Sequence, residues 1–312
     1  MIWRVAAAVI AIVLLAAAGQ LVWRDVQDGS SPISPSSHSR LTVSGAPYSW
    51  PMADPATRSS CQAAEGFREA AGKNSASLDT APLAPFGRLE AGWDIYLPLI
   101  AREVGTDCPP QTPGFAQALA VFQRLHGLAA SGAMDATTLV ALKAVWMSRR
   151  PFVAATAHGA CPSPPALGLM AWAAPAEGYA AKPIQLRIPA LNAYRDMVAA
   201  ARREDAAISA DHRVLTIFSG FRDPAADAAN CLAQNDCGEP ATATCSAHRT
   251  GLAVDLYLGS APGYRPESTA DPNRLYQSRS PAFRWMAANA SRFGFVNYPF
   301  EPWHWEWTGE AP

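Results

Sequence analysis

Two short segments near the C-terminus alternate apolar and other side chains with a period of two, which is typical of β-strands. The first is Leu252-Ala-Val-Asp-Leu-Tyr-Leu258, and its only charged residue is Asp255. Because successive strand residues point to opposite faces, the leucines and Val254 share one face and Asp255 lies on the other. A charge inside an apolar strand needs a partner or a metal. This segment therefore predicts a strand with a functional polar face.

The second segment, Trp303–Trp307, places its tryptophans on one face and His304 and Glu306 on the other. Pro302 disfavours a helix through Glu301 and His304, so the pattern differs from the helical His-Glu-x-x-His zinc motif. For Glu306 two interpretations stay open, namely that it orients a metal ligand or that it has a surface or cross-strand role. The segment predicts a final strand with a second polar face.

The two strands and the residues just before them contain a complete set of zinc ligands and a general base. His248, just ahead of the first strand, joins Asp255 and His304 as two imidazoles and one carboxylate. Three such ligands leave the fourth zinc position open, as a catalytic site requires. Glu301 lies three residues before His304 and can act as general base toward water activated by the metal. Arg222, after an expected strand, can stabilise a developing oxyanion or serve as a structural ion-pair partner.

Three motifs of this chain resemble the zinc D,D-peptidases that include the VanY-like carboxypeptidases and the dipeptidases of vancomycin resistance. They are Ser-x-His-x-x-Gly-x-Ala-x-Asp, Glu-Pro-Trp-His and an upstream Ser-Gly-Phe-Arg, and the resemblance covers about residues 185–309. It implies one Zn²⁺ held by His248, Asp255 and His304, with Glu301 as base, Arg222 as transition-state stabiliser and Ser246 as a substrate contact. The implied reaction removes the terminal D-Ala from a peptidoglycan stem peptide ending in D-Ala-D-Ala.

Other activities fit the same residues. An L,D-carboxypeptidase or a peptidoglycan endopeptidase could use the same zinc site, because the loops 223–244 and 260–280 set the dimensions of the pocket. A non-catalytic wall-binding protein is a third alternative, and the intact Glu301 argues against it. The bond that is cleaved therefore stays open at this point.

The surrounding pattern predicts an α+β domain over residues 184–312. Helices are expected at 189–205 and 281–292, with Gly294 ending the second, and a further strand is expected at 213–219. The resemblance implies a small antiparallel sheet flanked by helices.

A small all-α module is expected over residues 61–150. Helical spacing of apolar residues within the stretch 115–128 predicts one helix, which Gly127 would end. Asp135 can cap a second helix over 136–146. The pattern resembles, over roughly 80–148, the helical peptidoglycan-binding module of many wall hydrolases, and this implies wall glycan or peptide as a partner. A structural helix bundle is the alternative.

The N-terminus predicts export. Residues 1–24 contain a long apolar run between Arg4 and Arg24, which suits either an uncleaved signal anchor or a cleaved signal peptide. We expect a periplasmic or extracytoplasmic protein anchored to the inner membrane by this segment, or alternatively one secreted after cleavage. Residues 25–60 are expected to be a disordered linker and residues 151–183 a second linker.

Cysteine content and charge narrow the class further. Six cysteines in an exported chain predict disulfides, and proximity suggests Cys61 with Cys108 and a short loop closed by two of Cys231, Cys237 and Cys245. A structural zinc site made of cysteines is the alternative.

The net charge of −1 and a charged fraction of 16% exclude the basic stripe that nucleic-acid binding needs.

Overall fold

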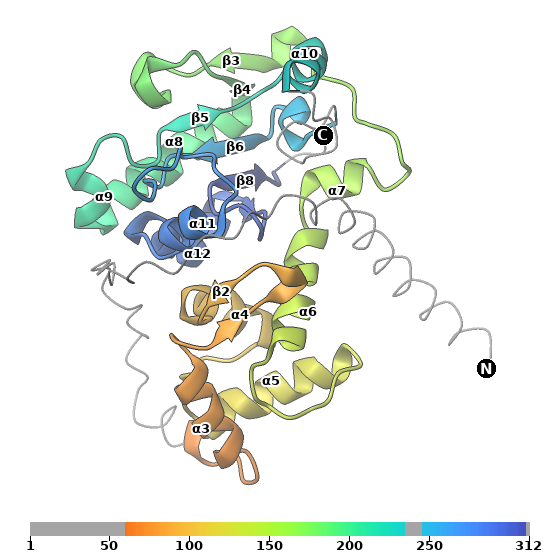
Figure 1. Ribbon diagram of the computed structural model, residues 1–312, viewed down its shortest axis with the longest axis vertical. Helices are drawn as coiled ribbons and strands as arrows, with labels where there is room; N and C mark the ends of the chain where they lie inside the picture. Colours follow the sequence, from red (N-terminus) through yellow and green to blue (C-terminus); the bar gives the residue numbers. More distant parts are fainter. Residues whose placement is uncertain (1–59, 235–244, 310–312) are drawn as a thin grey trace, which may run out of the picture. The chain divides into compact units, whose positions relative to one another are not determined.

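The computed structural model describes residues 60–234 and 245–309 (Figure 1). The expected signal segment 1–24 and all but the last residue of the expected linker 25–60 lie outside the described residues. Among the residues that are described, no helix is both long and apolar enough to cross a membrane.

The helices, in chain order, are α3 (Arg68–Ser77), α4 (Leu97–Val104), α5 (Pro113–Leu125), α6 (Ala136–Ser148), α7 (Pro151–Ala155), α8 (Ile188–Glu204), α9 (Ala206–Ala210), α10 (Pro224–Gln234), α11 (Asp271–Ser278) and α12 (Pro281–Asn289). The strands are β1 (Pro82–Leu83), β2 (Glu90–Ala91), β3 (Met170–Trp172), β4 (Gln185–Arg187), β5 (Ile217–Ser219), β6 (Ala253–Leu256), β7 (Phe295–Asn297) and β8 (His304–Trp307).

A four-stranded sheet with the order β5-β6-β8-β7 forms the centre of the C-terminal half (Figure 1). Each neighbouring pair in it is antiparallel. Helices and small antiparallel sheets together make this an α+β structure, as expected. The register pairs Asp255 of β6 directly with His304 of β8. Directly paired residues have their Cβ atoms about 5 Å apart, so the register alone brings these two side chains together.

Strand alternation sorts the two faces of the sheet as predicted. Val254 and Leu256 of β6 and Trp305 of β8 are buried in the hydrophobic core. They lie there with Met197 of α8 and Phe283 of α12. Since these apolar side chains take one face, Asp255 and His304 are left on the other. Burying a large apolar side chain contributes about 1.5–3 kcal/mol, so a shift in register by one residue is strongly opposed.

The predicted elements of this domain differ from the observed ones mainly at their ends. The expected strand 213–219 is shorter than predicted, because Leu215 takes a positive φ of 65° and only Ile217–Ser219 continues as β5. The helix expected over 281–292 is α12 followed by a 3-10 turn, Ala290–Phe293. Gly294, with φ 81°, ends that turn as expected.

The N-terminal helices follow the predicted pair. Asp135 caps α6, since its side chain accepts a hydrogen bond from the Thr138 amide. The all-α expectation is wrong in one detail, because β1 and β2 pair as a short antiparallel ladder. The turn Pro85–Gly87 between them bends the chain back, with Phe86 at a positive φ of 55°.

The segment 151–183, expected as a linker, contains α7 and β3, and β3 pairs antiparallel with β4.

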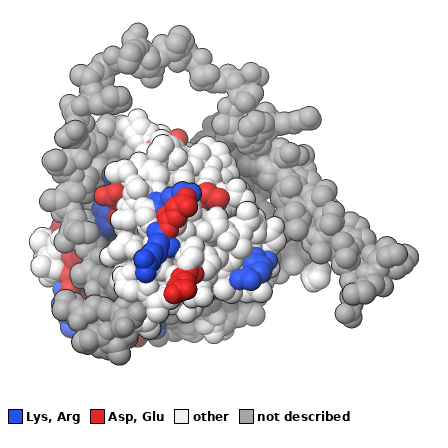
Figure 2. Space-filling model, turned by 90° about the horizontal axis from the view of Figure 1, so that it is seen from below, with Lys and Arg blue, Asp and Glu red and all other residues white. Residues whose placement is uncertain are grey.

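Figure 2 views the molecule from the lower end of Figure 1, where α3 and α5 lie. On this face the few acidic and basic groups are interspersed, so no patch of a single sign forms on the part of it that is described.

Disulfides are present, as the cysteine count predicts. The pairing of Cys61 with Cys108 is confirmed. Cys245 pairs with Cys161 instead of closing a short loop with a nearby cysteine. Cys231 is also disulfide-bonded, and Cys237 lies outside the described residues. Proximity in sequence missed Cys161 because folding brings the segment after α7 to the start of the His248 turn.

Candidate metal centre and active site

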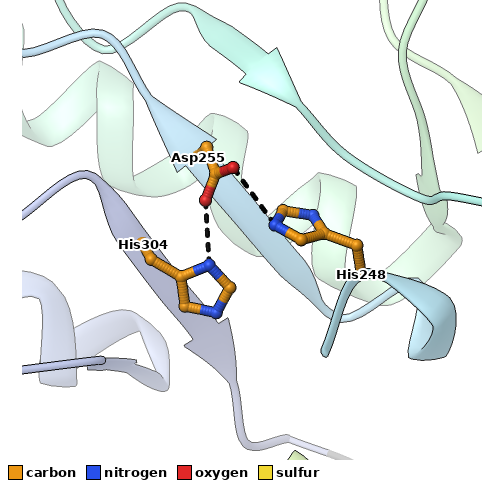
Figure 3. Close-up of side chains that lie close together, drawn as sticks. All are labelled: His248, Asp255 and His304. Atoms are coloured by element: carbon orange, nitrogen blue, oxygen red, sulfur yellow. Dashed lines mark hydrogen bonds and ion pairs between the residues drawn. The ribbon is translucent and has the colours of Figure 1, made fainter. Parts of the chain in front are cut away.

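Three predicted ligands converge on the polar face of the sheet (Figure 3). His248, Asp255 and His304 are all buried, and each offers one ligand atom within 4.8 Å of the others. Asp255 and His304 come from paired strands. His248 lies on a 3-10 turn, Ala247–Thr250, that leads into β6. Gly251 ends this turn at a φ of 70°, a conformation that glycine adopts without strain.

Each histidine faces the Asp255 carboxylate with one ring nitrogen. His248 Nε2 lies 3.1 Å from Asp255 Oδ2, and His304 Nδ1 lies 2.9 Å from Asp255 Oδ1. The other ring nitrogen of each histidine also has a partner. His248 Nδ1 lies 2.7 Å from the Gly220 carbonyl oxygen, and His304 Nε2 lies 3.4 Å from Glu306 Oε1. These outward contacts fix the orientation of both rings.

The contacts of His248 require positive charge at the centre of the cluster. A carbonyl oxygen can only accept, so His248 Nδ1 carries the proton that is donated to Gly220. In the neutral ring, Nε2 then presents a lone pair to a carboxylate oxygen. Burial lowers the pKa of His248, which favours this neutral form. Two acceptors that face each other at 3.1 Å fit a cation between them.

His304 leads to the same conclusion, because both of its ring nitrogens face carboxylates and a neutral imidazole donates from only one. Burial lowers the pKa of His304, but hydrogen bonds to Asp255 and Glu306 outweigh it and raise this pKa to about 9. Burial raises the pKa of Asp255, yet its close contacts with His248 and His304 bring it below its ordinary value. The cluster is therefore a site that attracts a cation.

The donor set fits zinc. Two imidazole nitrogens and one carboxylate oxygen are zinc ligands, and three ligands leave a position open for reaction. Ligand histidines in zinc sites typically donate their other N–H to a carbonyl or a carboxylate, as Gly220 and Glu306 would accept here. Gly220 suits this role because a Cβ there would lie 2.8 Å from the Gln185 carbonyl oxygen of β4.

Glu301 lies beside the ligands in a tight turn between β7 and β8. The turn is held by backbone hydrogen bonds from Glu301 to Tyr298 and from His304 to Glu301, both 3.0 Å long. Asn297 supports it by donating to the carbonyl oxygens of Glu301 and His304. Glu301 Oε2 lies 4.0 Å from His304 Nδ1, the nitrogen that also faces Asp255. Burial raises the pKa of Glu301, although the charge of His304 opposes this.

Arg222 and Ser246 meet at a residue that the sequence did not reveal, Asp227 of α10. Arg222 Nε lies 3.5 Å from Asp227 Oδ1, and Ser246 Oγ donates to Asp227 Oδ2 at 3.4 Å. The Arg222 amide also donates to the His248 carbonyl oxygen. The positive charge of Arg222 lowers the pKa of both His248 and Glu301, so it acts across the same site. A lone aspartate on an alanine-rich helix carries no sequence signal for such a role.

Glu306 is not a surface residue, since only 1% of it is exposed. Besides His304, it contacts Arg150, whose Nε lies 2.5 Å from Glu306 Oε1, and the Phe152 amide, which donates to Oε2 at 3.0 Å. Burial raises the pKa of Glu306, but the hydrogen bond with His304 and the charge of Arg150 outweigh it and lower this pKa to about 2. Arg150 was not expected at the site, because 156 residues separate it from Glu306.

Comparison with known proteins agrees with this geometry. The chain matches a family model described as VanY, D-alanyl-D-alanine carboxypeptidase, over residues 183–310. No curated protein and no solved structure matches the chain. The matched range contains the three converging ligands together with Glu301, Arg222 and Ser246. Residues 183–310 are thus similar to the VanY family of D-alanyl-D-alanine carboxypeptidases, and this match indicates a peptidase-type domain in that part of the chain.

Proposed function

We propose that this protein is a zinc-dependent D,D-carboxypeptidase that hydrolyses the terminal D-Ala of peptidoglycan stem peptides. The observation that carries the proposal is the convergence of His248, Asp255 and His304, in which His248 Nε2 lies 3.1 Å from Asp255 Oδ2 while its Nδ1 lies 2.7 Å from the Gly220 carbonyl oxygen. The VanY match over residues 183–310 supports the reaction class.

His248, Asp255 and His304 would hold the zinc ion. When bound, zinc supplies a Lewis acid for the scissile carbonyl and lowers the pKa of a coordinated water toward about 7. Fixed ring orientations favour zinc binding, because the outward hydrogen bonds to Gly220 and Glu306 keep the two inward nitrogens in place.

Glu301 would move the proton that hydrolysis requires. The water oxygen forms the new bond to the carbonyl carbon, the peptide C–N bond breaks, and the proton passes through Glu301 to the leaving amine of D-Ala. A general base works best when its pKa lies near the working pH, and burial raises the pKa of Glu301 in that direction. Arg222 would stabilise the developing oxyanion, and Ser246 would contact the substrate.

The proposed setting is the bacterial wall outside the cytoplasm. We propose that the N-terminal segment exports the chain and anchors it to the inner membrane, or is cleaved to release it. The helical module before residue 150 would contact wall glycan or peptide. The near balance of charge lacks the basic stripe that nucleic-acid binding needs.

The test is release of D-Ala from a pentapeptide ending in D-Ala-D-Ala. We expect release that a chelator abolishes and added zinc restores. Glu301→Gln should lower kcat by about 10²- to 10⁴-fold while zinc still binds, because the ligands are intact. The exposed Glu69, whose carboxylate pairs with Lys73 on the surface of α3, provides the matched control Glu69→Gln, which should leave kcat unchanged.

Mass spectrometry of digested muropeptides then identifies the bond. Loss of a single terminal D-Ala supports the proposal. Cleavage of an internal bond, or after an L-residue, replaces it with the endopeptidase or L,D-carboxypeptidase alternative. Wild-type protein that binds zinc but cleaves no muropeptide refutes it.

A further inference from the structure

The metal cluster has a contact that comes from outside the VanY-matching region. Arg150 lies between α6 and α7, upstream of residue 183, and its side chain is 9% exposed. Its Nε and Nη2 atoms both lie 2.5 Å from Glu306 Oε1. The Phe152 amide, on the first turn of α7, holds the second oxygen of the same carboxylate. Residues of one short upstream segment thus fix both oxygens of Glu306.

The fixed Glu306 carboxylate in turn contacts the predicted ligand His304. Its Oε1 atom, the one that Arg150 holds, lies 3.4 Å from His304 Nε2. The other ring nitrogen of His304 faces Asp255. The direction of the inward nitrogen therefore depends on where the Glu306 carboxylate lies.

Arg150 also contacts a second neighbour of the same ligand, Tyr298. Its guanidinium lies over the Tyr298 ring, 4.0 Å from the centroid. The Tyr298 ring in turn meets His304 edge-to-face, with centroids 5.8 Å apart. Arg150 thus supports two of the groups that surround the His304 ring.

A second buried network joins the upstream region to the Glu301 turn. Lys143 of α6 is buried with Glu90 and donates to the Pro299 carbonyl oxygen at 3.3 Å. Arg274 of α11 lies 3.6 Å from the same Glu90 carboxylate and donates to the Phe300 carbonyl oxygen at 2.8 Å. Pro299 and Phe300 are the two residues before Glu301. The region upstream of residue 183 therefore contacts both the surroundings of the ligand His304 and the turn that carries the proposed base Glu301.

We propose that Arg150 is a positioning residue for the metal ligand His304, acting through Glu306, and that the region upstream of the VanY match is part of the peptidase site. The proposal rests on the proposed zinc-dependent function. A guanidinium is planar and presents its donors in a fixed direction, which suits the orientation of a carboxylate better than an ammonium does. Contacts that orient ligand histidines typically change metal affinity by 10- to 100-fold when they are lost.

The experiment measures zinc affinity of the full chain by competition with a chelating dye, together with kcat and KM for the pentapeptide. Arg150→Met removes the contact, Arg150→Lys keeps the charge but not the planar group, and Arg149→Met is the matched control. Arg149 is adjacent, half exposed, and paired with Glu103 rather than with the site.

We expect Arg150→Met to weaken zinc binding by about 10-fold or more, with KM at saturating zinc within about twofold of wild type. Arg150→Lys should recover only part of the affinity, and Arg149→Met should bind zinc like wild type. A purely structural role would change thermal stability of the zinc-free protein without this graded loss of affinity.

Wild-type zinc affinity in Arg150→Met overturns the proposal, and so does full recovery of affinity in Arg150→Lys, since charge alone would then suffice. If Arg150→Met does not fold, Arg150→Lys decides. Wild-type protein is measured alongside: failure to bind zinc or release D-Ala refutes the proposed function, whereas active wild type with unaffected variants refutes this inference alone.

Discussion

Replacing Lys143 with methionine tests how strongly the upstream helices are tied to the peptidase domain. The Lys143 ammonium lies 2.5 Å from Glu90 Oε1, and the two side chains are only 2% and 3% exposed. It also lies 3.1 Å from the Tyr96 hydroxyl and 3.3 Å from the Pro299 carbonyl oxygen. Methionine has a similar length and no charge, so it removes these contacts while filling most of the space.

The expected loss in free energy of unfolding depends on which charges remain beside Glu90 in the variant. Removing one partner of a buried ion pair typically costs about 3–5 kcal/mol, because the other charge stays buried without compensation. Arg274 Nη2 stays 3.6 Å from the same carboxylate oxygen and offsets part of this. We therefore expect Lys143→Met to lower the free energy of unfolding by about 3 kcal/mol, the lower end of that range.

Urea-induced unfolding, followed by tryptophan fluorescence, measures this change. Lys73 is the control, since it pairs with Glu69 at 2.8 Å but both side chains are largely exposed. Lys73→Met should change stability by less than about 0.5 kcal/mol. The double variant Lys143→Met/Glu90→Gln removes both charges and should recover more than half of the loss. A loss below about 1 kcal/mol for Lys143→Met would refute the reasoning.

Two further predictions concern a disulfide and a surface ion pair. Cys161 and Cys245 are 84 residues apart, so the chain-entropy model predicts a loss of up to about 4–5 kcal/mol for Cys161→Ser/Cys245→Ser. Unchanged thermal unfolding of that variant would contradict this. The hydrogen bond that Glu177 accepts from Arg195 lowers the pKa of the Glu177 carboxyl from its ordinary 4.5. This ion pair therefore stabilises the fold fully above pH 4.5, and its contribution disappears as the pH falls through the lower folded-state pKa. The stability gap between wild type and Glu177→Gln should therefore shrink as the pH falls below 4.5, and a gap that is constant from neutral to acid would exclude the pair as its cause.

Local patterns predicted the centre of the site because its geometry is mostly local. Strand alternation places Asp255 and His304 on the faces opposite to the core, and the structure shows their apolar neighbours buried. His248 lies seven residues before Asp255, so the turn and the strand bring both to one place. The roles of these residues in catalysis remain predictions that the experiments above test.

The surroundings of the site were not predictable in the same way. Asp227 joins Arg222 to Ser246 from a helix that carries no distinctive pattern. The strand at 213–219 was overestimated because the positive φ of Leu215 comes from its local turn and not from its residue type. The Cys161–Cys245 bond was missed because nearness in sequence is a poor guide to nearness in space.

The sequence by itself determined the strand faces, the donor set and the domain type, because side-chain period and residue chemistry act over a few neighbouring residues. Tertiary structure decided which distant charges complete the site. Arg150 meets Glu306 across 156 residues, and Lys143 meets the Pro299 carbonyl oxygen across the same separation. Such pairs form where packing excludes water from two charged or polar groups at once. Local sequence patterns do not predict them, because the two groups are far apart in the chain.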